Sequence, residues 1–378
     1  MARYNEPIVD VDIHHKPRTD AEIVAYLPAR WREYVAGDGH GNTDLVPVRH
    51  LGGGGLTPGS QADRWATDGS RPGSSLELMR EQLLDRHNYW RVVLTHDQGE
   101  WAALHNPYFA REVTRAYNNW NIDTWLSWDD RFYSAVAVPN GEPEEAAKEI
   151  RRVGGHPRLV SVLLGVNALG RPFGDPLYHP IYEAAVEMGL QISVHPGPWN
   201  RPNSTVHSVG GGRGLTEWLS QAGQAGMAHI ASMIVHGVFE KYPDLKVVIK
   251  EHGVTWLPSL MWRLDDNVDL LRHESPWVQR LPSEYIHDHI KLSTQPIEES
   301  SDDRRGLAKL LQSVEGMENL LCFSTDYPHP TDDEPEFAMR QFPAGWLPKV
   351  FCTNACDVYG WTPPPLPSSQ RSLAGSTR

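Results

Sequence analysis

The sequence has few cysteines, and their spacing does not indicate a set of stabilising disulfide bonds. It contains three in 378 residues: Cys322, Cys352 and Cys356. An odd and low count argues against a disulfide framework and is typical of a reducing compartment. Cys352 and Cys356 have C-x3-C spacing, but no second Cys or His pair accompanies them. A zinc knuckle is therefore not expected.

Positive charge is also scarce. The chain has 35 Lys and Arg against 48 Asp and Glu, a formal net charge of −13. This balance argues against nucleic acid or an anionic membrane surface as a partner, although a small anionic substrate remains compatible with it. No N-terminal signal peptide is evident, and no apolar run approaches the roughly 20 residues that span a bilayer. We expect a cytoplasmic protein.

What the chain does contain is an alternation of short β-branched runs with helix-like segments. Strands alternating with helices predict a parallel sheet with crossover connections, and eight repeats predict a closed (β/α)8 TIM barrel. The expected strands are Ile8–Ile13, Arg91–Thr95, Tyr133–Val138, Leu159–Leu164, Leu190–His195, Leu245–Lys250, His289–Ser293 and Leu320–Thr325. The expected helices include Tyr108–Trp125, Pro143–Val153, Pro180–Met188, Gly226–Lys241 and Ser301–Ser313.

Two stretches fall outside this alternation. Residues 36–74 are rich in Gly, Asp, Ser and Pro and read as a long loop insertion after the first strand. That insertion lies at the end of the barrel where active sites occur, so a substrate lid and a loop of no special role are both open. Residues 362–378 form a Pro/Ser-rich tail that we expect to be disordered. We therefore predict a single barrel domain over residues 1–361.

Ligand-type side chains stand at the carboxyl ends of the expected strands. Asp12 and His14 close the first strand and share one face, because side chains along a strand alternate with period 2. His195 ends the fifth strand and Asp326 follows the eighth. Singly, such a His is more often structural and such an Asp more often a helix N-cap. Together, at the catalytic face of a barrel, they predict a shared site for Zn, Mn or Fe.

Other residues at this face are candidates for contact with a substrate or for catalysis. Glu251 and His252 follow the sixth strand, His329 lies three residues after Asp326, and Trp199 could support a flat substrate after the fifth strand. The fourth strand ends without the lysine that commonly bridges two metals in such barrels. A single metal ion is therefore expected.

Several motifs resemble those of the amidohydrolase-2 type family, which includes aminocarboxymuconate semialdehyde decarboxylase and the resorcylate-type and carboxyvanillate decarboxylases. The resemblance covers residues from Ile8 to about Tyr359. The motifs are Asp10-Val11-Asp12-Ile13-His14, Pro180-Ile181-Tyr182, Val194-His195-Pro196-Gly197, the run from Gly237 to Lys246, Glu251-His252-Gly253, Trp256-Leu257-Pro258, and the run from Phe323 to His329. This combination is specific to the family but not to one substrate.

The resemblance implies one divalent metal bound by Asp12, His14, His195 and Asp326, with His252 close by. Several members have His-x-His on the first strand. Asp12 in the first of these positions makes the ligand set harder, so Zn is favoured but Mn is compatible. The resemblance also implies a small-molecule substrate and a homo-oligomer, most simply a dimer.

Two chemistries fit this ligand set. His252 resembles the decarboxylases, so the leading hypothesis is non-oxidative decarboxylation of a small aromatic or unsaturated carboxylic acid. Asp326 or His252, with Glu251 as a further catalytic candidate, would move the proton. The alternative is hydrolysis of an amide, lactone or ester by metal-bound water, with Asp326 as the base and His252 stabilising the oxyanion. A barrel that binds without turnover is disfavoured by the intact ligand set.

Overall fold

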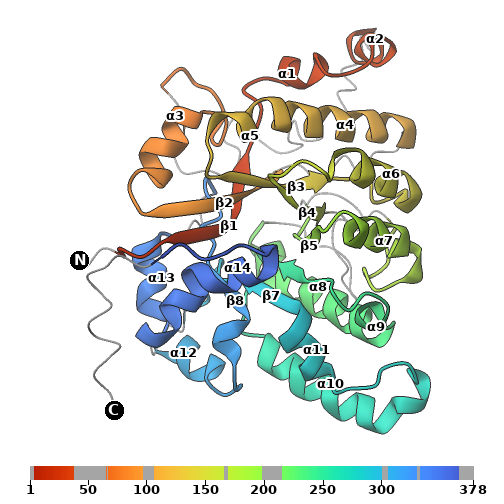
Figure 1. The fold of residues 1–378 in the computed structure, drawn as a ribbon, viewed down its shortest axis with the longest axis vertical. Helices are drawn as coiled ribbons and strands as arrows, with labels where there is room; N and C mark the ends of the chain where they lie inside the picture. Colours follow the sequence, from red (N-terminus) through yellow and green to blue (C-terminus); the bar gives the residue numbers. More distant parts are fainter. Residues whose placement is uncertain are drawn as a thin grey trace.

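Eight parallel strands form the centre of the molecule (Figure 1). The structure is a computed structural model, and it describes residues 4–37, 65, 67–96, 106–165, 169–197, 215–299, 305–329 and 333–365. The strands pair in sequence order from β1 to β8, which confirms the predicted parallel barrel. Their bounds are β1 Ile8–His15, β2 Tyr89–His96, β3 Phe132–Ala137, β4 Leu159–Leu164, β5 Gln191–Val194, β6 Val247–Ile249, β7 Ile290–Ser293 and β8 Leu321–Cys322.

Residues just beyond β8 form backbone hydrogen bonds with β1, which brings the two edges of the sheet together. Three backbone hydrogen bonds cross this seam: Val11 N to Phe323 O at 3.0 Å, Asp326 N to Asp12 O at 3.1 Å, and His14 N to Tyr327 O at 2.8 Å. The eighth strand is therefore shorter than the predicted run, because residues 323–327 leave regular strand geometry and bond to β1. The seam fixes the first and last strands beside each other where the candidate ligands lie.

Helices surround the strands, as the alternation predicts (Figure 1). Helices α4, α6 and α7 agree with expected segments to within two residues, whereas α8 begins at Leu215 rather than Gly226, and α10 has no counterpart among the segments named above. Gly237, with φ 73°, separates α8 from α9 within one predicted helix. Their bounds are α1 Asp20–Val24, α2 Ala29–Gly37, α3 Leu76–Met79, α4 Pro107–Asp123, α5 Trp125–Trp128, α6 Pro143–Val153, α7 His179–Glu187, α8 Leu215–Val235, α9 Val238–Lys241, α10 Leu257–Leu271, α11 Pro282–His289, α12 Gly306–Leu311, α13 Pro335–Gln341 and α14 Asn354–Tyr359.

Helix α6 illustrates why these segments form where they do. Pro143 begins the helix, Glu144 and Glu145 lie in its first turn, and Arg151 and Arg152 lie in its last. Proline at the first position and charges that oppose the helix dipole both stabilise such a helix. Its apolar side chains recur with helical spacing and are buried: Ala146, Ala147, Ile150 and Val153. The sequence therefore predicts both the helix and the face that packs inward.

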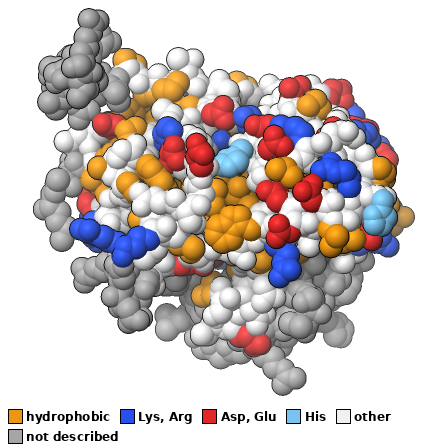
Figure 2. All heavy atoms as spheres, turned by 90° about the horizontal axis from the view of Figure 1, so that it is seen from below, with side chains coloured by type: hydrophobic (Ala, Val, Ile, Leu, Met, Phe, Trp, Pro, Cys, Tyr) orange, Lys and Arg blue, Asp and Glu red, His pale blue; other side chains and the backbone are white. Residues whose placement is uncertain are grey.

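Parts of the two unusual stretches lie outside the described residues. Of the expected 36–74 insertion, residues 38–64 and 66 are not described, and neither is the tail from residue 366. Among the helices that the structure describes, none has the length and apolar character needed to cross a membrane. On the face shown in Figure 2, the described residues include acidic and basic side chains interspersed with apolar ones.

Candidate metal centre

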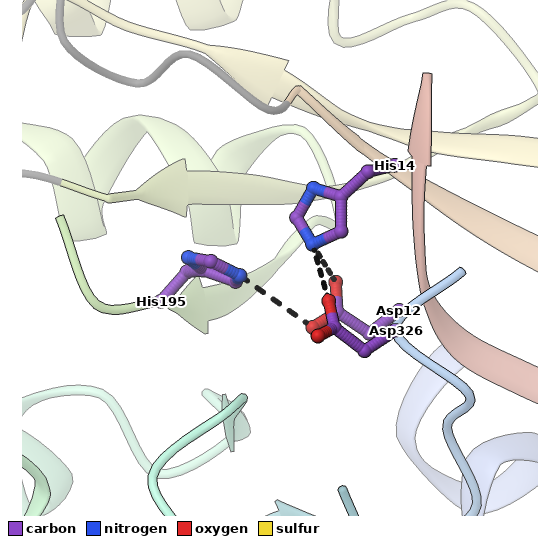
Figure 3. A group of neighbouring side chains, drawn as sticks. All are labelled: Asp12, His14, His195 and Asp326. Atoms are coloured by element: carbon purple, nitrogen blue, oxygen red, sulfur yellow. Dashed lines mark ion pairs between the residues drawn. The ribbon is translucent and has the colours of Figure 1, made fainter. Parts of the chain in front are cut away.

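Four side chains converge at the carboxyl ends of three strands (Figure 3). Asp12 and His14 come from β1, His195 directly follows β5, and Asp326 lies beyond β8. His14 Nε2 lies 2.9 Å from Asp326 Oδ1, and His195 Nε2 lies 3.6 Å from Asp12 Oδ2. One ligand atom from each of the four residues falls within 4.8 Å of all the others. The four residues proposed from the sequence as ligands therefore lie together.

The donor atoms of this group are suited to a metal ion. Asp12 Oδ2, Asp326 Oδ2 and His195 Nε2 are buried and have no hydrogen-bond partner among the described residues. Such orphaned buried atoms are rare unless an ion or water satisfies them. Two ligand atoms on one metal, each at about 2.1 Å, are at most about 4.2 Å apart, so the 4.8 Å limit of this group exceeds that separation by only about 0.6 Å. Two imidazoles and two carboxylates are an appropriate ligand set for Zn or Mn.

The His195 ring is held in the orientation that a ligand needs. Its Nδ1 lies 2.8 Å from Pro196 O, so Nδ1–H donates to this carbonyl and Nε2 presents its lone pair to the site. Burial lowers the pKa of His195 to about 4, against the attraction of Asp12. The imidazole is therefore neutral at physiological pH, which is the form that binds metals.

Asp12 is supported from inside the barrel by residues that the sequence analysis missed. Thr95 Oγ1 donates to Asp12 Oδ1 at 2.5 Å, and Lys250 Nζ lies 3.5 Å from the same oxygen. Burial opposes ionisation of Asp12, but Lys250 and the neighbouring histidines outweigh it and lower the pKa to about 2. Burial lowers the pKa of Lys250, and Asp12 counters that effect. The sequence does offer one signal for Lys250, because a charged lysine is unusual at the end of an apolar strand run such as Leu245–Lys250.

Backbone strain is concentrated at the site. Among the described residues, Glu251 and Asp326 are the non-glycine residues with positive φ, at 56° and 64°. Such conformations cost about 1–3 kcal/mol and cluster at functional sites. Burial opposes ionisation of Asp326, but His329 and His14 outweigh it and lower its pKa. His329 Nδ1 lies 2.8 Å from Asp326 Oδ1.

The two residues after β6 that were proposed for catalysis point in different directions. Glu251 Oε2 lies 3.2 Å from His195 Nε2, and Glu251 groups with Asp326 and His329. His252 Nδ1 lies 2.5 Å from Lys250 O, and its ring lies against Gly226 of α8. The structure therefore brings Glu251 to the candidate ligands and places the His252 ring beside α8.

The remaining candidates divide between the site and its surroundings. His329 stacks on His14 with ring centroids 4.3 Å apart and is partly exposed, so it borders the metal centre. Trp199 lies outside the described residues. His15 points away from the centre, as the strand alternation requires, and its Nε2 lies 2.9 Å from Asn121 Oδ1 of α4.

A barrel that gathers two carboxylates and two imidazoles at its catalytic face belongs to the class of metal-dependent barrel enzymes. The sequence profile of one such family, described as amidohydrolase, matches residues 10–361. The chain belongs to this amidohydrolase family. The resemblance inferred from the motifs is thereby confirmed.

Several proteins that are similar to this chain in sequence are decarboxylases. The chain is 24% identical over 263 residues to a gamma-resorcylate decarboxylase of Polaromonas sp. strain JS666, covering 66% of this chain and 76% of the relative. It is 27% identical over 237 residues to a 2-amino-3-carboxymuconate-6-semialdehyde decarboxylase of Dictyostelium discoideum, covering 61% and 60% of the two chains.

Solved structures share the fold. A 5-carboxyvanillate decarboxylase from Novosphingobium aromaticivorans, complexed with manganese and 4-hydroxy-3-methoxy-5-nitrobenzoic acid, matches with a TM-score of 0.66. It is 18% identical, and the match covers 94% of this chain and 96% of the other. An amidohydrolase from Mycobacterium avium subsp. paratuberculosis matches with a TM-score of 0.68 at 18% identity, covering 96% and 99%. At this identity, the likeness establishes the fold.

Proposed function

We propose that this protein is a metal-dependent carboxy-lyase that removes CO2 from a small aromatic carboxylic acid without oxidation. The observation that carries the proposal is the four-residue centre, three of whose buried acceptor atoms find no hydrogen-bond partner in the part of the chain that the structure describes. The decarboxylases among the relatives support lyase chemistry over hydrolysis. An unsaturated acid, as in the carboxymuconate relative, belongs to the same proposal.

We propose one divalent ion bound by Asp12, His14, His195 and Asp326. Three carboxylates, those of Asp12, Asp326 and Glu251, meet at the site, and the Lys250 ammonium offsets one of their charges. One divalent ion would neutralise the two remaining negative charges. Half of the ligands are carboxylates, and a structural neighbour contains manganese. These observations move the proposal from Zn, which the sequence favoured, towards Mn.

When bound, a divalent ion supplies Lewis-acid stabilisation of negative charge that develops on the substrate. The chain's own residues must then deliver a proton to the carbon that loses CO2. Our candidates for this step are Asp326 and Glu251, since both face the centre and lie together with His329. His329 is partly exposed and lies 2.8 Å from Asp326, so it can pass a proton from solvent to that carboxylate. We therefore assign proton transfer to Asp326, Glu251 and His329.

Glu251, rather than His252, is proposed as the catalytic residue after β6. The Glu251 backbone N–H donates to Ser293 Oγ at 3.0 Å, which helps to hold the strained conformation. Glu298 accepts hydrogen bonds from Val254 N and Thr255 N at 2.9 and 2.8 Å, which fixes the following segment. His252 is assigned a supporting role beside α8.

The test is an assay of product formation. Protein loaded with Mn²⁺ is offered hydroxylated benzoates and unsaturated acids with CO2 detection, in parallel with esters, lactones and amides. We expect CO2 from at least one aromatic acid and little hydrolysis. Glu251→Gln should lower turnover at least about 100-fold, as expected for an acid–base group, whereas His252→Gln should lower it far less. Hydrolysis without CO2 release would establish the alternative chemistry.

We also propose that the chain forms a homodimer, as the family resemblance implies. Apolar side chains on α10 and after it support an interface, because Trp262, Leu270 and Trp277 are 54%, 77% and 49% exposed. Light scattering should give twice the chain mass of 42.5 kDa. The variant with both Trp262→Glu and Leu270→Glu should give a smaller mass if this face is the contact.

A further inference from the structure

The Lys250 side chain is buried inside the barrel. It directly follows β6, is fully shielded from solvent, and reaches towards β1 and β2. Its Nζ lies 2.9 Å from Thr95 Oγ1 and 3.5 Å from Asp12 Oδ1. An ammonium group is almost never buried to this extent unless it is paired, because the loss of hydration is costly. The Asp12 carboxylate and the Thr95 hydroxyl are its observed partners.

The two carboxylate oxygens of Asp12 have different surroundings. Thr95 Oγ1 accepts from Lys250 and donates to Asp12 Oδ1, so this oxygen is held on the interior side. Asp12 Oδ2 lies 3.6 Å from His195 Nε2, and no described residue forms a hydrogen bond with it. One oxygen therefore faces a fixed cation and the other faces the candidate metal.

We propose that Lys250 is a built-in counter-cation of the metal centre, which compensates Asp12 when no metal is bound and weakens binding of the divalent ion. This inference rests on the proposed metal site. Two cations on opposite oxygens of one carboxylate repel each other, and the interaction is strong in a dry interior. The site thus stays assembled without metal, and the metal remains exchangeable.

Neutral replacements of Lys250 separate this role from simple packing. Lys250→Met keeps the apolar stem, and Lys250→Gln also keeps a donor for Thr95. For each variant and the wild type, Mn²⁺ affinity is measured by competition with a fluorescent chelator, and Tm is measured with and without Mn²⁺. We expect Kd for Mn²⁺ to fall at least about tenfold. Metal-free Tm should fall by about 5 °C, and the rise on adding Mn²⁺ should be larger than in wild type.

The matched control is Thr95→Val, which removes the intervening hydroxyl and keeps the ammonium. It should not tighten Mn²⁺ binding. Unchanged or weaker binding in both Lys250 variants overturns the inference, as does equal tightening by Thr95→Val. Failure of both variants to fold in saturating Mn²⁺ also contradicts it, because the bound ion should replace the missing charge. If wild-type protein binds no Mn²⁺, the proposed metal site itself is wrong.

Discussion

Replacing Thr325 by Val tests whether the seam between β1 and β8 holds the metal centre together. Thr325 and Asp10 are buried at this seam. The Thr325 hydroxyl donates to Asp10 Oδ2 at 2.7 Å and accepts from Tyr327 N at 3.2 Å. Valine has nearly the same shape, so the substitution removes these two hydrogen bonds without opening a cavity.

The expected loss in the free energy of unfolding follows from the two hydrogen bonds that Thr325→Val removes. Burial raises the pKa of Asp10 to about 8, so its carboxyl group is largely neutral at pH 7 and each of the two bonds contributes about 1 kcal/mol. We therefore expect a loss of about 2 kcal/mol, which for a chain of 378 residues lowers Tm by roughly 2–3 °C. Because Asp326 directly follows Thr325 and its N–H bonds to Asp12 O, affinity for Mn²⁺ should weaken as well.

The assay is thermal unfolding followed by circular dichroism, with Mn²⁺ titration of the folded protein. Thr325→Ser is the control, because it keeps the hydroxyl and loses one methyl group, at a cost of about 1 kcal/mol. The order of Tm should be wild type, Ser variant, Val variant. A Val variant as stable as the Ser variant would refute the reasoning.

Two further predictions concern the centre and the pH dependence of stability. Asp326→Asn should abolish turnover yet keep the Tm of metal-free wild type, because Asn tolerates positive φ and retains an acceptor for His14 and His329. Retained turnover would show that Asp326 is not required. Burial lowers the pKa of His229 from 6.5 to about 3, so its contribution is full above pH 6.5 and is lost as pH falls towards 3. Between pH 7 and pH 5, wild type should lose about 2 kcal/mol more stability than His229→Asn in urea titrations. Parallel pH profiles would contradict this assignment.

Much of the fold follows from the order of apolar runs. Each of the eight predicted strands overlaps an observed strand, and Leu159–Leu164 matches β4 at both ends. The period-2 spacing of Asp12 and His14 placed both on one face of β1. Strand ends were less predictable, because the seam bonds of residues 323–327 depend on a neighbour some 300 residues away in sequence.

The residues around β6 show where sequence reasoning is insufficient. Regular alternation sends Glu251 and His252 to opposite faces but does not say which one enters the site. The positive φ of Glu251 breaks the alternation after Lys250, and no local pattern in the sequence marks a non-glycine residue for that conformation. The role of Lys250 depends on Asp12 and Thr95, which become its neighbours only when the barrel forms.

The most direct test of this account is a crystal structure of the protein grown with Mn²⁺, with anomalous scattering recorded at the manganese edge. We predict one strong anomalous peak per chain, within bonding distance of Asp12, His14, His195 and Asp326. A peak elsewhere, or two peaks at the centre, would contradict the proposed mononuclear site.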